Sequence, residues 1–191
     1  MNESFFAYLS RMRYIGRWSL MRNALPENIQ EHSHMVAVLA HALGVIRRDV
    51  FHVPCRPEEA AAVALFHDSS EILTGDLPTP IKYYNPDIKA AYKQVERISG
   101  EKLLSMVPPA LRERYEHLVL EDDEGVNPIV KAADKLSAYI KCIEEQKAGN
   151  TEFDSAARQT MEAMEKMEQP ELEWFIRECL PAFSLNLDEL E

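Results

Sequence analysis

The chain has 191 residues, 46% of them hydrophobic, and a net charge of −11, which suits one domain with a sizeable core and argues against wholesale disorder. The negative charge disfavours long nucleic acids and anionic membranes as partners, because both select basic surfaces. The sequence has no CxxC pair, no secretory signal and no apolar run of the ~20 residues that span a bilayer. We therefore expect a cytoplasmic protein with no disulfide framework.

Proline and glycine divide the chain into segments in which apolar residues recur at helical spacing. Alternating strand patterns with tight hairpin turns are absent from the sequence. The segments expected to be helices are, in chain order, residues 4–14, 28–48, 57–74, 87–106, 109–119, 127–148, 152–168 and 170–179. We therefore predict an all-α fold with a single domain over residues 1–191.

The first long helix carries three histidines that helical geometry separates. His32 lies in line with Val36 and Leu43 on the inward side, whereas His34 and His41 project from the opposite side. An inward histidine is most often a hydrogen-bonded core residue. Taken alone, His32 therefore leaves a structural role and a ligand role open.

The next helix ends in a cluster of ionisable side chains. His67, Asp68 and Glu71 fall within an arc of about 100° on a continuous helix, so all three side chains can address one point. An imidazole and two carboxylates buried together without a cation would be costly. A divalent metal ion would offset that cost, because imidazole and carboxylate are ordinary metal ligands.

The helix over residues 127–148 offers a further acidic candidate. Asp134 lies away from the main apolar stripe, on a side where Ser137 would permit close approach of another helix. An equally good interpretation is a solvent-exposed carboxylate between Lys131 and Lys135. Spacing alone does not choose between the two.

Two further segments have simpler interpretations. The acidic run at 121–125 lacks the ligand spacing of a calcium loop and indicates a solvated turn. Met161, Met164 and Met167 recur every third residue, which favours packing in the core or against a partner helix over contact with a cofactor.

The order His32, His67–Asp68 and Asp134 resembles the HD superfamily of metal-dependent phosphohydrolases, which are all-helical. The surrounding segments RWSLMRN, ENIQEHS, HDSSEILTGDLPTPIKYYN and VKAADKLSAYIKCIEE are more specific, and resemble the bacterial 5′-deoxynucleotidase family within it. The similarity extends from the first helix to the tail PAFSLNLDEL. It implies a single-domain helical HD-domain bundle.

The resemblance also implies roles for individual residues. The metal ligands it implies are His32, His67, Asp68 and Asp134, with cobalt or manganese as the favoured ion, and Glu71 is implicated in catalysis. The implied substrate-binding residues are Arg17, Trp18, His32, Asp68, Asp76, Leu77, Pro78, Thr79 and Asp134. Arg17 matches the position at which the family disfavours a ribose 2′-hydroxyl. The family is further described as homodimeric.

Three functional hypotheses follow. The first is a metal-dependent phosphomonoesterase that converts deoxyribonucleoside 5′-monophosphates to deoxyribonucleoside and phosphate and discriminates against ribonucleotides; its cation would let an acidic protein bind a phosphate dianion. The second keeps the metal but makes the enzyme a cyclic-nucleotide phosphodiesterase or a ppGpp pyrophosphohydrolase. The third is a helical protein-interaction module in which the HD cluster is a satisfied polar core.

Overall fold

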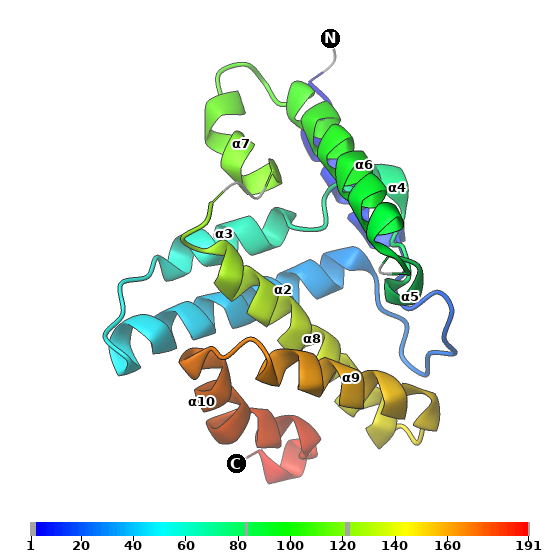
Figure 1. Cartoon of the computed structure of the whole chain (residues 1–191), viewed down its shortest axis with the longest axis vertical. Coiled ribbons are helices and arrows are strands. Elements are labelled where there is room, and N and C mark those ends of the chain that lie inside the picture. Colours follow the sequence, from blue (N-terminus) through cyan, green and yellow to red (C-terminus); the bar gives the residue numbers. More distant parts are fainter. Residues whose placement is uncertain (1–2, 83, 121–122, 191) are drawn as a thin grey trace.

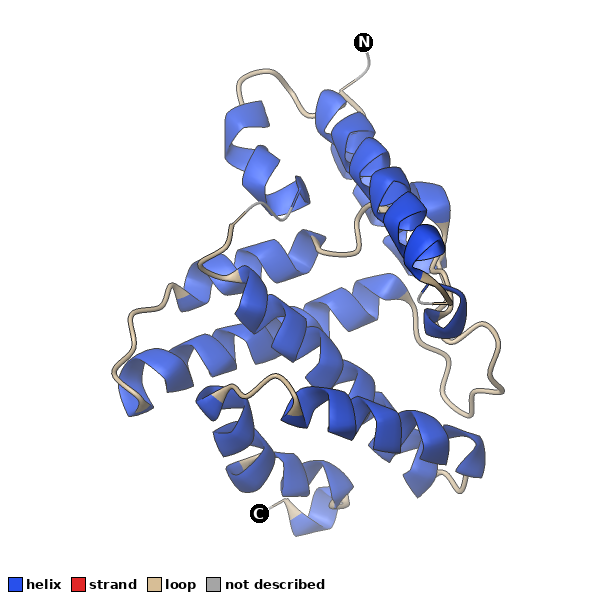
Figure 2. Cartoon of the chain, in the orientation of Figure 1, coloured by secondary structure: helices blue, strands red, loops and turns tan. Residues whose placement is uncertain are grey.

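The computed structural model describes residues 3–82, 84–120 and 123–190, and within these ranges every regular element is a helix (Figures 1 and 2). The α-helices are α1 (Phe5–Leu9), α2 (Ile29–Val45), α3 (Pro57–Phe66), α4 (Glu71–Thr74), α5 (Thr79–Lys82), α6 (Pro86–Ser105), α7 (Arg112–Leu120), α8 (Asn127–Lys147), α9 (Asp154–Glu165) and α10 (Pro170–Glu178). Shorter 3₁₀ and π turns are η1 (Ser10–Tyr14), η2 (Ile46–Val50), η3 (Thr151–Phe153), η4 (Leu180–Ser184) and η5 (Leu187–Glu189). The all-α prediction is confirmed. No helix in the described ranges combines the length and apolarity needed to cross a membrane.

The main core lies where α2 packs against α3 and α8 in the middle of the molecule (Figure 1). Its fully buried side chains include Val36, Leu43, Val63, Ile129 and Leu136. Burial of each such side chain stabilises the fold by roughly 1.5–3 kcal/mol. The two helices α2 and α3 approach each other closely at Gly44, because a Cβ atom there would lie 2.9 Å from the Cα atom of Pro57.

A second hydrophobic cluster joins α1, α6 and α7 above the end of α3. The ring of Phe5 is fully buried and stacks 6.3 Å from Phe66, with Tyr115 at 5.4 Å in an edge-on arrangement. Leu103 of α6 and Val119 of α7 complete the cluster. Because Phe66 is the last residue of α3, this cluster fixes the chain immediately before the HD dipeptide.

Local signals explain where α2 begins. The side chain of Asn28 accepts hydrogen bonds from the backbone N–H groups of Gln30 and Glu31, and the Glu31 carboxylate accepts from the Asn28 N–H in return. This capping box satisfies backbone donors that the first helical turn leaves without partners. The cap therefore sets the start of the helix one turn before His32.

The predicted helix over 57–74 is wrong in one respect, since it is interrupted at residues 67–70. The His67 Nδ1 atom lies 2.7 Å from the Ala64 carbonyl oxygen, the acceptor that a continuing helix would pair with the Asp68 N–H. The backbone instead forms a tight turn in which the Ser69 N–H bonds to Phe66 at 2.9 Å. The HD dipeptide therefore lies in a turn between α3 and α4, and the prediction that His67, Asp68 and Glu71 share one arc of a continuous helix is wrong.

Other expectations hold among the described residues. His34 and His41 are exposed while His32 is fully buried. Met164 is buried, and Met161 and Met167 pack beside it against the main core. Of the acidic run, residues 121–122 lie outside the described ranges, and the rest forms a turn.

Candidate metal centre

His32 enters the site from the first turns of α2 and is held on both ring nitrogens. Its Nδ1 atom lies 3.1 Å from Ser137 Oγ of α8. Its Nε2 atom lies 3.1 Å from Asp134 Oδ1 and 3.7 Å from Asp68 Oδ2. Asp134 is thus turned towards the site, although its other oxygen also pairs with Lys135 at 3.2 Å. The alternative of a purely solvent-exposed carboxylate is wrong.

His67 has a ring orientation that assigns its proton. The Ala64 carbonyl can only accept, so the Nδ1 atom 2.7 Å away carries the hydrogen. In the neutral imidazole the Nε2 atom then presents a lone pair, and it lies 3.2 Å from Asp68 Oδ2. Two electron-rich atoms at that distance repel each other unless a proton or a cation lies between them. The arrangement is that of a metal-ligating histidine oriented by a backbone carbonyl.

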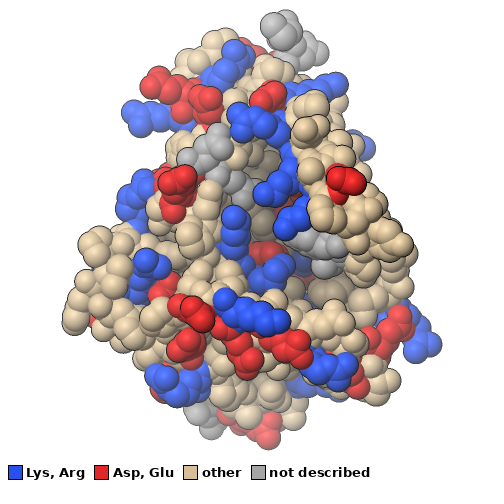
Figure 3. Space-filling model, in the orientation of Figure 1, with Lys and Arg blue, Asp and Glu red and all other residues tan. Residues whose placement is uncertain are grey.

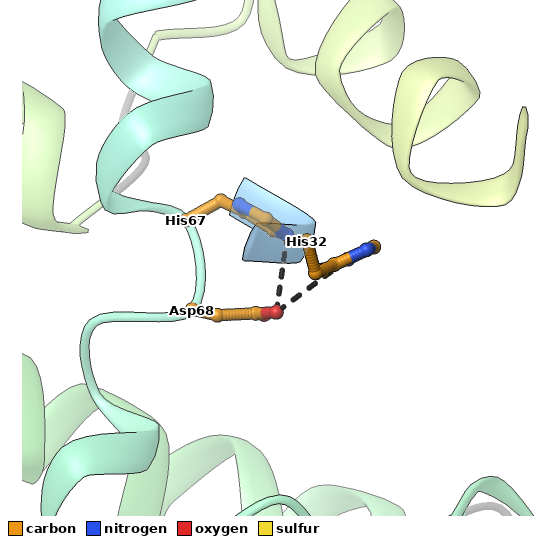
Figure 4. A group of neighbouring side chains, drawn as sticks. All are labelled: His32, His67 and Asp68. Atoms are coloured by element: carbon orange, nitrogen blue, oxygen red, sulfur yellow. Dashed lines mark ion pairs between the residues drawn. The ribbon is translucent and has the colours of Figure 1, made fainter. Parts of the chain in front are cut away.

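His32, His67 and Asp68 together form a candidate cation site (Figure 4). Each offers one ligand atom, and all of these atoms lie within 4.8 Å of one another. Ligand atoms that share a cation at about 2.1 Å lie roughly 3.0 to 3.4 Å apart in octahedral or tetrahedral geometry. Asp134 lies outside this mutually close set and joins it through its contact with His32. The two imidazoles and the Asp68 carboxylate fit a divalent cation by their chemistry, and the 3.2 and 3.7 Å separations of Asp68 Oδ2 from the two Nε2 atoms are close to the spacing of ligands that share one ion.

Electrostatics keep the donors in their ligand forms. Burial lowers the pKa of His32 below its usual value, and the Arg17 guanidinium lowers it further, so the imidazole is neutral at pH 7. Burial alone would raise the pKa of Asp68, but His67 and His32, which are protonated in the acidic range where this carboxyl group titrates, together with the hydrogen bond from His67 and the Arg17 guanidinium, outweigh burial and hold the pKa well below its usual range. The pKa of Asp134 is likewise lowered, chiefly by Lys135 and His32 against the effect of burial.

Glu71 is the first residue of α4 and lies close enough to Asp68 and Asp76 for their charges to affect its carboxyl group. Its side chain is buried, and its Oε2 atom has no hydrogen-bond partner within the described part of the chain. Burial, with the negative charges of Asp68 and Asp76, raises the pKa of Glu71 to about 9. A buried carboxyl group with a free oxygen and a raised pKa is equipped to hold and release a proton.

Arg17 and Trp18 lie on the loop between η1 and α2. Arg17 Nη1 donates a hydrogen bond to Glu27 at 2.7 Å. Burial would lower the pKa of Arg17, but the negative charges of Glu27, Asp68 and Asp134 raise it. The Trp18 ring is half-buried, 5.2 Å from the ring of Phe153. Arg17 therefore lies within electrostatic reach of the candidate metal centre, and contacts with Glu27 and Phe153 hold Trp18 beside it.

The loop after α4 also reaches the site through its acidic residue. Gly75 adopts a φ of +75°, a conformation that favours glycine, and turns the chain out of α4. Asp76, Leu77 and Pro78 follow, all half-buried. Burial raises the pKa of Asp76 while Arg17 opposes that rise, which places the two charges within mutual influence. Thr79 begins α5, but its side chain lies outside what the structure describes.

The chain is similar to known proteins in sequence and in fold. Residues 4–183 match the family model described as 5′-deoxynucleotidase YfbR-like. The chain belongs to the YfbR-like 5′-deoxynucleotidase family. Within that family, the 5′-deoxynucleotidase of Shewanella oneidensis is 47% identical, covering 97% of this chain and 96% of the relative. The enzyme of Vibrio parahaemolyticus is also 47% identical, with 100% of both chains covered. The predicted enzyme class, a 5′-deoxynucleotidase, is confirmed.

Solved structures confirm the predicted HD fold. An HD-domain phosphohydrolase from Listeria innocua is 24% identical with a TM-score of 0.82, covering 96% of this chain and 90% of its own. The HD phosphohydrolase of cyanophage S-2L, bound to dA and one catalytic Zn²⁺ ion, is 22% identical with a TM-score of 0.66, covering 92% and 95%.

Three contacts around the site were not predicted from the sequence. Ser137 orients His32, and its position three residues after Asp134 on the same helix face is the signal that identifies it. Lys82 forms an ion pair with Glu96 at 2.6 Å. Its positive charge lowers the pKa of Glu71 and so partly offsets the effect of burial. Glu27 accepts hydrogen bonds from both Arg17 and Trp18, and no motif or periodic pattern in the sequence identifies it as their partner.

Proposed function

We propose that this member of the family hydrolyses deoxyribonucleoside 5′-monophosphates to deoxyribonucleoside and phosphate with the help of a divalent cation, and that it discriminates against ribonucleotides. The observation that carries the proposal is the convergence of His32, His67 and Asp68 near the buried carboxyl group of Glu71, whose Oε2 atom has no hydrogen-bond partner among the described residues. Family membership supports the reaction, and the site chemistry supports the cation.

The residues that would hold the cation are His32, His67, Asp68 and Asp134. We propose cobalt or manganese as the ion, although ligand sets of this kind also accept zinc. When bound, the cation neutralises charge on a phosphoryl oxygen and lowers the pKa of a water molecule. Bound phosphate would lie against His32, Asp68 and Asp134, which places these residues at the substrate as well as at the metal.

Glu71 would exchange a proton during the reaction. Its carboxyl group can take a proton from the attacking water or deliver one to the departing 5′-oxygen, because it is buried beside the cluster with one oxygen free of partners in the described ranges. The nearby cation would lower its pKa from the value of about 9 and so favour the ionised, proton-accepting form.

Substrate recognition would fall to the loops on either side of the centre. The Arg17 guanidinium has a planar donor fork suited to phosphate or sugar oxygens, and Trp18 offers an aromatic face. Asp76, with Leu77, Pro78 and Thr79, would line the sugar and base. Figure 3 shows Lys and Arg side chains gathered around a hollow beside α6, so local positive charge is present despite the net charge of −11.

A substrate panel tests the proposed function. Metal-free protein is supplied with Co²⁺, Mn²⁺ or Zn²⁺ and given dAMP, AMP, 3′,5′-cyclic AMP and ppGpp in turn. The expected result is phosphate release from dAMP, slower release from AMP, and no cleavage of cyclic AMP or ppGpp. Preferential cleavage of ppGpp or cyclic AMP would contradict the proposal.

We propose further that residues 1–191 act as one HD domain in a cytoplasmic homodimer. The support for a dimer lies on α6, where Ile88, Val95 and Ile98 are exposed at spacings that place them along one side of the helix. Light scattering coupled to size exclusion would report the mass of a dimer, and an Ile98→Glu variant would report that of a monomer if this side of α6 forms the contact.

A further inference from the structure

One carboxylate oxygen lies between the two side chains proposed to recognise the substrate. Glu27 Oε2 accepts a hydrogen bond from Arg17 Nη1 at 2.7 Å and another from Trp18 Nε1 at 3.1 Å. The Arg17 and Glu27 side chains are only 13% and 16% exposed. Hydrogen bonds to a charged acceptor that is shielded from water are stronger than neutral ones. Both recognition side chains therefore depend on the same acceptor.

The backbone brings Glu27 to this position independently of its side chain. The Arg17 N–H donates to the Glu27 carbonyl at 2.9 Å, and the Ile29 N–H donates to Ile15 at 3.0 Å. Between these bonds, Gly16 and Asn28 form an isolated antiparallel bridge. Because Asn28 also caps α2, the loop that carries Arg17 and Trp18 is joined to the helix that carries His32.

Trp18 adopts a backbone conformation that needs such support. Its φ of +58° lies in the left-handed region, which large side chains rarely enter. A conformation of this kind persists only when surrounding contacts determine it. Three contacts do so on the side chain: the hydrogen bond to Glu27, the packing of the ring at 5.2 Å from Phe153, and the Arg17 guanidinium 5.8 Å from the ring centroid.

From these contacts we infer that Glu27 is a positioning residue that fixes Arg17 and Trp18 and thereby sets the preference for deoxyribose over ribose. The inference rests on the proposed function. Rejection of one extra hydroxyl group requires a side chain that cannot move aside, because an adaptable side chain makes room for the larger substrate. Glu27 occupies one arm of the Arg17 fork and leaves the remaining donors in a fixed direction.

The test compares Glu27→Ala and Glu27→Gln with a matched control. Glu152 is a second glutamate that contacts the same loop, where it accepts from the Arg22 N–H at 3.2 Å, but it bonds to neither recognition side chain. The quantity measured is the ratio of kcat/KM for dAMP to kcat/KM for AMP at equal metal content. In Glu27→Ala this ratio should fall about tenfold or more, the effect of losing a hydrogen bond to a charged group.

The expected pattern separates positioning from general damage. In Glu27→Ala, KM for dAMP rises while kcat changes little, since Glu27 touches no proposed metal ligand. Glu27→Gln keeps an acceptor but loses the charge, and its ratio should lie between those of wild type and alanine. Glu152→Ala should keep the wild-type ratio. A wild-type ratio in both Glu27 variants would overturn the inference.

A second measurement needs no substrate. In a Trp174→Phe background, Trp18 is the one remaining tryptophan of the chain, and acrylamide quenching reports how well its ring is held. Quenching should increase in Glu27→Ala and stay unchanged in Glu152→Ala; equal quenching in all three proteins would also overturn the inference. If wild type cleaves AMP as fast as dAMP, the proposed function itself fails. If wild type prefers dAMP and the Glu27 variants keep the same dAMP-to-AMP ratio, only the role of Glu27 is rejected.

Discussion

Replacing Glu145 by alanine should destabilise the protein strongly, although the residue lies outside the metal centre. The side chain is fully buried in α8 and forms an ion pair with the equally buried Lys141 one turn earlier. Its carboxylate also accepts from the backbone N–H groups of Ala24 and Leu25 at 2.8 and 3.0 Å, and from Asn150 Nδ2 at 2.7 Å. Glu145 thus holds the recognition loop against α8.

The size of the effect follows from what the substitution leaves behind. Alanine would strand the Lys141 ammonium group in the interior with the Leu25 carbonyl as its one remaining acceptor among the described residues. Removing one partner of a buried ion pair costs about 3–5 kcal/mol, and each backbone donor left without an acceptor adds about 1 kcal/mol or more. We expect a loss of about 4 kcal/mol or more in the free energy of unfolding, or roughly 10 °C or more in Tm.

Urea unfolding followed by far-UV circular dichroism measures this loss. The double variant Glu145→Ala with Lys141→Met provides the control, because removing both charges leaves no uncompensated ion. It should recover a large part of the stability lost in Glu145→Ala. A single variant within about 1 kcal/mol of wild type, or a double variant less stable than the single one, would refute the reasoning.

Three shorter predictions follow. Burial raises the pKa of Glu145, but the bonds from Lys141 and Asn150 outweigh burial and lower the pKa to about 2 from its usual 4.5. The resulting stabilisation is complete above about pH 4.5 and is lost as the pH falls towards 2. In urea unfolding, Glu145→Gln should therefore lose less stability on acidification than wild type does. Glu71→Gln should lower kcat by about 10²–10⁴ with metal content unchanged, and near-normal turnover would remove Glu71 from the mechanism. A chelator should lower Tm and Co²⁺ should restore it; an unchanged Tm would argue against a bound cation.

The long helices were predictable because several signals agree. The apolar stripe of α8 and the proline at its start predicted residues 127–148, and the helix spans Asn127–Lys147. The stripe of α2 likewise placed His32 inside, since the whole helix face must be buried. Periodicity carries such information because it reflects burial along a complete helix.

The HD turn and the loop contacts were not predictable in the same way. At the break after α3 the His67 side chain bonds to the Ala64 carbonyl that a continuing helix would use, and no periodic pattern records such a contact. The orientation of Asp134 depends on the packing of α8 against α2. Glu27 depends on backbone pairing between residues twelve apart, Gly16 and Asn28, which only the folded loop reveals.

The claim on which all of this depends is that His32, His67 and Asp68 gather around one divalent cation. Calorimetric titration of metal-free wild-type and Asp68→Ala protein with Co²⁺ tests it directly, with cooperative unfolding of the variant verified first. We predict saturable binding of one Co²⁺ ion per wild-type chain and loss of that binding in the variant. Equal Co²⁺ binding by the two proteins would contradict the account.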